Sequence, residues 1–112
     1  MTPHEIGQAM ERVLAQLDQL VEDMRESGNE LARTERLYKV RYAKARVKMR
    51  AEAQKQTVDA VNDRATIECE EELFDYTIAT STITYTREAL RACEAKLDAL
   101  RSLSASVRGA GG

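Results

Sequence analysis

Apolar residues recur every three or four positions along most of this sequence, which is the spacing of a helix with one buried face. Near the start the spacing is 4, 3, 4, 3 and 4, over Ile6, Met10, Val13, Leu17, Leu20 and Met24. Towards the end a strict 3-4 repeat runs over Ile83, Thr86, Leu90, Cys93, Leu97, Leu100, Ser104 and Val107. Both patterns predict heptad seams, which are helix faces that need a partner helix.

Start and stop signals predict an all-α fold of about three long helices in a hairpin or bundle. The predicted helices span residues 3–27, 30–66 and 69–107. The first begins with a capping box, in which Thr2 caps the helix and Glu5 reaches back. It is expected to end at Gly28, because glycine readily adopts the left-handed cap conformation. The stretch Thr77–Thr86 has the β-branched residues of a strand, but no second strand could pair with it, so helix is predicted there too.

A length of 112 residues predicts one domain, and we expect the C-terminal seam to join copies of the chain into a homo-oligomer. A lone helix would leave this apolar seam in water, whereas two or more copies would bury it. The parts of the predicted domain are an acidic N-terminal helix (1–28), a basic helix (29–66), a seam helix with an acidic start (67–108) and a flexible tail (109–112). The predicted oligomerisation residues are Ile83, Leu90, Leu97, Leu100 and Val107.

Positive charge is concentrated in one stretch, residues 33–55, although the net charge of the whole chain is -2. This basic stretch holds nine of the 17 lysines and arginines and only two acids. The nine cations are Arg33, Arg36, Lys39, Arg41, Lys44, Arg46, Lys48, Arg50 and Lys55. On a helix they form two rows beside an apolar stripe. The stripe consists of Leu31, Tyr38, Tyr42, Ala45, Met49 and Ala53.

Rows of cations with tyrosines nearby suit a polyanion, and single-stranded nucleic acid above all. The cations would contact phosphates, and the ring of Tyr38 or Tyr42 could stack on a base. Both rings also lie on the apolar stripe, so burial in the core is the competing interpretation for them. A solvated basic helix face without a ligand is the competing interpretation for the cations.

The balance of charge reverses between Asp59 and Asp75, where there are seven acidic residues and a single basic one, Arg64. The densest part of this segment is an acidic cluster of Glu68, Glu70, Glu71 and Glu72. We expect the cluster to be a solvated turn or helix start. The alternatives are a partner for the basic stretch or a contact for a basic protein.

The residue types that catalysis needs do not come together in this sequence, so we expect no enzyme, cofactor or metal site. The only histidine is His4, beside the N-terminal cap, and there is no glycine-rich phosphate loop. Cys69 and Cys93 lack paired metal-ligand spacing and are expected to be reduced core residues. No apolar run matches a signal peptide or a membrane span, which favours a cytoplasmic location.

Several segments of Tyr38–Val107 also carry a family resemblance. They are the basic segment MRAEAQK (49–55), the segment IATSTITY (78–85), Ala89-Leu90-Arg91, and the segment AKLDALRS (95–102). Together they resemble the UvsY-type recombination mediators of tailed phages. The chain departs from that pattern in being shorter around the acidic cluster, and its first 30 residues have no counterpart.

The resemblance implies a small helical protein of the host cytoplasm that binds single-stranded DNA and oligomerises through its C-terminal part. It also implies that the protein helps a RecA-like recombinase to replace the single-strand-binding protein. The leading hypothesis is therefore a DNA-binding accessory of phage recombination or replication. The alternative is a non-enzymatic helical adaptor or inhibitor, which would bind a protein partner through its heptad seams.

Overall fold

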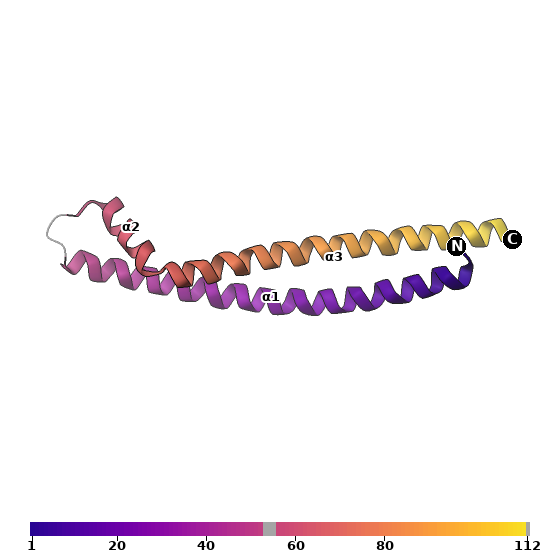
Figure 1. Cartoon of the computed structure of the whole chain (residues 1–112), viewed down its shortest axis with the longest axis horizontal. Coiled ribbons are helices and arrows are strands. Elements are labelled where there is room, and N and C mark those ends of the chain that lie inside the picture. Colours follow the sequence, from indigo (N-terminus) through magenta and orange to yellow (C-terminus); the bar gives the residue numbers. More distant parts are fainter. Residues whose placement is uncertain (53–55, 112) are drawn as a thin grey trace. The chain divides into compact units, whose positions relative to one another are not determined.

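A computed structural model describes residues 1–52 and 56–111 of the chain. These residues form three helices, α1 (Pro3–Glu52), α2 (Val58–Glu68) and α3 (Glu70–Gly111) (Figure 1). No strand occurs among them, so the predicted all-α fold is confirmed. No helix in the described part of the chain combines the length and the apolarity that crossing a membrane requires.

The first two predicted helices are in fact one, because α1 continues without a break through Gly28 (Figure 1). The expected left-handed cap is absent, since no described glycine has a positive φ. The reason lies in the buried face, which keeps its helical phase on both sides of Gly28 through Met24, Ser27, Leu31 and Thr34. Packing along this face outweighs the helix propensity lost at one glycine, which is about 1 kcal/mol relative to alanine.

Replacing Gly28 by alanine is expected to stabilise the protein by about 0.5–1 kcal/mol. A Cβ built at this position meets nothing within 4 Å, and the backbone is helical. Alanine therefore reduces the entropy of the unfolded chain without introducing a clash. The measurement is urea unfolding followed by circular dichroism. The control is Gly109→Ala near the end of α3, where fraying makes a smaller gain the expected result; an equal or larger gain there would contradict the explanation.

The predicted helix over residues 30–66 is divided, because α1 ends at Glu52 and a separate helix, α2, begins at Val58. Thr57 then caps α2, its side-chain oxygen accepting a hydrogen bond from the Ala60 amide at 3.1 Å. Asp59 lies in the first turn, where a carboxylate is favoured by the helix dipole. A threonine cap followed by an acid was therefore an overlooked start signal.

Cys69 is the single residue that connects α2 to α3. Its amide donates to the carbonyl oxygens of Ala65 and Thr66, at 3.1 and 3.2 Å, and so closes the last turn of α2. Its own carbonyl accepts from the Leu73 amide at 2.9 Å and so opens the first turn of α3. This junction lies close to the predicted start of the third helix at residue 69.

The threonine-rich stretch Thr77–Thr86 is helical, as predicted. Its hydroxyls bond back to carbonyl oxygens one turn earlier, from Thr77 to Leu73 at 2.8 Å and from Thr80 to Tyr76 at 2.9 Å. Such bonds are compatible with a helix and satisfy the polar groups. The segment predicted to be a flexible tail is helical as far as it is described, because α3 continues to Gly111; Gly112 lies outside the described residues.

Tertiary contacts divide the chain into two compact units, and α1 and α3 each contribute to both. Unit 1 combines Met1–Glu26 with Thr84–Gly112. Its core joins the two predicted heptad seams, with Val13, Cys93 and Leu97 buried together. Half-buried residues pack around them, namely Met10, Leu17, Leu20 and Leu100. The N-terminal and C-terminal seams are therefore partners of each other within one chain.

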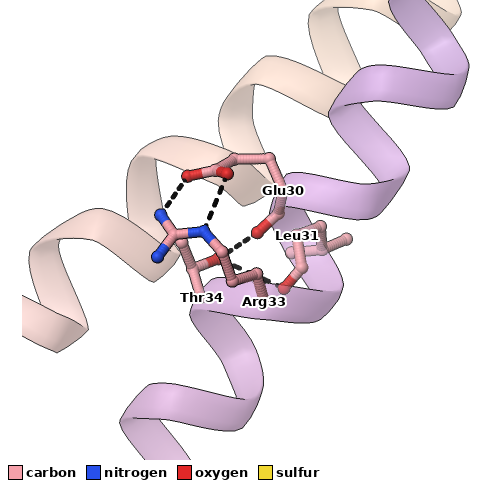
Figure 2. Close-up of polar contacts among 4 residues, drawn as sticks. All are labelled: Glu30, Leu31, Arg33 and Thr34. Atoms are coloured by element: carbon pink, nitrogen blue, oxygen red, sulfur yellow. Dashed lines mark hydrogen bonds and ion pairs between the residues drawn. The ribbon is translucent and has the colours of Figure 1, made fainter.

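Unit 2, Ser27–Ile83, contains the second part of α1, all of α2 and the start of α3. Its core cluster is made by Ala45, Met49, Val61, Ala65 and Cys69. The apolar stripe predicted on the basic stretch therefore packs against α2, although its last member, Ala53, lies outside the described residues. Thr34 is the buried polar residue of this part of α1, and its hydroxyl donates to the carbonyl oxygens of Glu30 and Leu31 (Figure 2).

Candidate functional site

The basic stretch occupies the end of α1 in unit 2, and most of its cations are on the surface. The exposed members are Arg33, Arg36, Lys39, Arg41, Lys44, Lys48 and Arg50. Arg46 is half-buried, and Lys55 lies outside the described residues. The predicted arrangement of cations beside a buried stripe is therefore present, at the residues that the structure describes.

Two of these cations pair with carboxylates one turn earlier on α1. Figure 2 shows Arg33 donating from Nε and Nη2 to the two carboxylate oxygens of Glu30, at 3.0 and 2.6 Å. Lys39 Nζ donates to Glu35 at 2.6 Å. The hydrogen bonds from Arg33 hold the pKa of the Glu30 carboxyl below its ordinary value. Both pairs are exposed to solvent, which screens their charges, so they contribute little to the stability of the helix.

Two further cations pair with carboxylates from other helices of unit 2. Arg41 Nη1 lies 3.5 Å from Glu68 Oε1, and Arg41 Nε lies 3.5 Å from Glu72 Oε1. Lys48 Nζ lies 3.9 Å from the same Glu68 oxygen. Since all four side chains are partly exposed, each pair contributes about 0–1 kcal/mol. The pairs place negative charge beside one row of the basic stretch.

We expected the acidic cluster to be solvated, but two of its four carboxylates form ion pairs. Glu68 and Glu72 are half-buried partners of the basic stretch, which was the alternative interpretation. Glu70 and Glu71 are exposed in the first turn of α3, where the helix dipole favours carboxylates. The cluster thus divides into an ion-pairing half and a helix-starting half.

Three exposed cations, Arg36, Lys44 and Arg50, form no ion pair with any described residue. Two of them lie on the rim of an open groove of about 730 Å³ on the outer side of α1. The groove is lined by Ala32, Arg33, Arg36, Leu37, Val40, Arg41, Lys44 and Glu72. Its floor is apolar and its rim carries four cations and one carboxylate. The two aliphatic residues of the floor were not predicted as part of a site: Val40 falls between the two predicted cation rows, and Leu37 falls within the row of Arg33, Arg41 and Lys44.

Tyr38, Tyr42 and Tyr76 are half-buried and pack within unit 2, which favours a packing role over stacking on a base. The Tyr38 and Tyr76 rings are stacked with centroids 5.8 Å apart, and Tyr42 lies 5.8 Å from Tyr38. Tyr38 and Tyr42 also pack against the core cluster of unit 2. Burial is the main cause of a raised pKa for the Tyr38 hydroxyl. The Arg46 guanidinium lies over the Tyr42 ring, 5.7 Å from its centroid, in a cation–π contact.

Both cysteines are core residues, as predicted. Cys69 is fully buried at the junction between α2 and α3, and burial raises the pKa of its thiol. Cys93 is buried in unit 1, where its thiol donates to the Val13 carbonyl oxygen at 3.4 Å. The raised pKa makes the Cys69 thiol a poor nucleophile and a poor metal ligand at neutral pH. No group of three or more metal-ligating side chains occurs among the described residues.

Two of the predicted oligomerisation residues pack against the N-terminal seam of the same chain. Leu97 is buried and Leu100 half-buried in the core of unit 1, against the N-terminal seam. Leu90 and Val107 are half-buried in the same unit, and Ile83 is half-buried in unit 2. The prediction of a homo-oligomer rested on this seam being open, and a single chain already covers much of it.

Comparison with known proteins gives no relative for this chain. No protein-family model matches it, and no significant match was found among curated proteins or among solved structures.

Proposed function

We propose that this chain is a non-enzymatic protein that binds single-stranded nucleic acid through the basic stretch of α1. The observation that carries the proposal is the pair Arg36 and Lys44, which are exposed, form no ion pair with a described residue, and flank an apolar groove floor. A cation without an ion-pair partner can contact a phosphate directly, whereas a cation paired with a carboxylate must first break that ion pair. The apolar floor of Leu37 and Val40 offers a surface for the face of a base.

The biological role that we attach to this binding is that of an accessory of phage recombination or replication. It follows from the resemblance of Tyr38–Val107 to the UvsY-type mediators. In this proposal a RecA-like recombinase and a single-strand-binding protein are partners in the host cytoplasm. The alternative of an adaptor that works through its heptad seams is less well supported, because Val13, Cys93 and Leu97 already bring the two seams together.

The direct test is a titration with a labelled oligonucleotide of single-stranded DNA at several salt concentrations. Contacts from Arg36 and Lys44 alone give a slope of about -1.4 for log affinity against log salt, and four rim cations give about -2.8. The measurement is fluorescence anisotropy. An affinity that does not vary with salt, or no binding at low salt, would reject the proposal.

The carboxylates that hold Arg41 and Lys48 are expected to limit this binding. Replacing Glu68 and Glu72 together by glutamine should raise the affinity for the oligonucleotide and steepen the salt slope by up to about 1.4, because two more cations become free for phosphates. The matched control is Glu70→Gln with Glu71→Gln, which changes the net charge equally at exposed positions with no ion pair to a described residue. Equal gains from the two double variants would show that net charge alone, rather than ion pairing, sets the affinity.

A further inference from the structure

The outer side of α1 carries exposed aliphatic residues within its basic stretch, and phosphate binding does not account for all of them. Val40 and Val47 are 45% and 68% exposed, and Lys44 lies between them. Residues four and seven positions apart share one side of a helix, so the three form a strip. We refer to Val40, Lys44 and Val47 as the basic strip. Only Val40 and Lys44 of this strip line the groove.

The same spacing occurs earlier on α1, in unit 1, with an acid in the middle. Leu14 and Val21 are 43% and 56% exposed, and Asp18 lies between them. These residues, Leu14, Asp18 and Val21, are the acidic strip. Glu11 flanks it as an exposed carboxylate, whereas the exposed carboxylate of Glu22 is paired with Arg25. Neither Asp18 nor Lys44 has an ion-pair partner among the described residues.

We propose that the basic strip of one copy docks against the acidic strip of a second copy of this chain. In each strip the charge lies four residues after the first aliphatic side chain and three before the second. Two such strips laid face to face bury four aliphatic side chains and bring Asp18 opposite Lys44. This holds for parallel and for antiparallel helices alike, because the charge is near the middle of each strip.

The partner is a second copy of this chain, because the basic strip and the acidic strip that complement each other both occur on α1. Opposite charges between the strips favour this pairing, and like charges oppose the pairing of a strip with itself. The surface is distinct from the C-terminal seam, whose Leu97 is buried within unit 1. The association needs no nucleic acid and goes beyond the proposed function.

The test is sedimentation velocity of the full chain without nucleic acid, over a wide concentration range at low salt. Asp18→Lys and Lys44→Glu are each expected to weaken association roughly tenfold, because each places like charges opposite one another. The double variant Asp18→Lys with Lys44→Glu restores the attraction with its sign reversed, so association should return. Val47→Asn should weaken association without changing any charge.

The matched controls are Glu94→Lys and Arg64→Glu, charge reversals at exposed positions outside both strips, which should sediment like the native chain. The proposal is overturned if the native chain is a monomer at every concentration. It is also overturned if the double variant associates no better than the single ones. Since these measurements contain no nucleic acid, their failure leaves the oligonucleotide test of the proposed function unaffected. Conversely, failure of the oligonucleotide to bind would not affect the evidence for docking between the strips.

Discussion

Replacing Arg36 and Lys44 together by glutamate is expected to reduce binding of single-stranded DNA by at least about a hundredfold. Each charge-assisted contact to a phosphate is worth about 1.5 kcal/mol or more, so the loss of two corresponds to this factor. The salt slope should become shallower by about 1.4. Both side chains are exposed and unpaired among the described residues, so the helix should remain intact, which circular dichroism can verify.

The structure also shows why these two positions are better targets than Arg41 and Lys48. Reversing the charge at Arg41 or Lys48 would repel Glu68 and disturb the packing of unit 2 as well as any ligand. A matched control is Arg64→Glu with Arg91→Glu, which changes the net charge equally at exposed positions on α2 and α3. Binding that survives the Arg36 and Lys44 reversals, or that falls equally in the control, would remove these residues from the site.

Leu97→Asp is expected to destabilise the chain by about 3–5 kcal/mol, which is a large part of the total stability of a typical domain. Leu97 is only 4% exposed and packs with Val13 and Cys93 in the core of unit 1. A carboxylate there would be buried without a partner, in addition to the lost apolar contact. The measurement is urea unfolding followed by circular dichroism.

Leu103→Asp provides the control on the same helix, because this leucine is 38% exposed. A surface substitution of this kind changes stability by about 0.5 kcal/mol or less. Equal effects at the two positions would mean that the seam of unit 1 is not packed as described.

Much of the fold was predictable because helical periodicity is a local property of the sequence. The heptad spacing from Ile6 to Met24 and the repeat from Ile83 to Val107 each predict a buried face, and the residues of both faces are buried or half-buried. The helix over Thr77–Thr86 was also predictable, since a strand without a partner strand is not viable. The rows of cations follow from the same periodicity.

The misplaced helix boundaries show where local signals were read in isolation. Gly28 has the properties of a cap, but the buried face continues in phase across it, and packing outweighed the preference of one residue. Thr57 carried a usable start signal, because it is followed by an acid in the first turn of α2.

The sequence by itself determined the helical periodicity, the identity of the buried faces and the concentration of positive charge on one stretch of α1. Only the tertiary structure decided which faces meet, because a heptad seam does not specify its partner. The C-terminal seam packs against the N-terminal one within the chain, although an oligomer would satisfy the same pattern. Tertiary structure also decided which cations are available: Glu68 and Glu72 come from other helices to pair with Arg41, whereas Lys44 is left without an ion pair among the described residues. Ion pairing between helices depends on distances in space, and these are set by packing rather than by spacing along the chain.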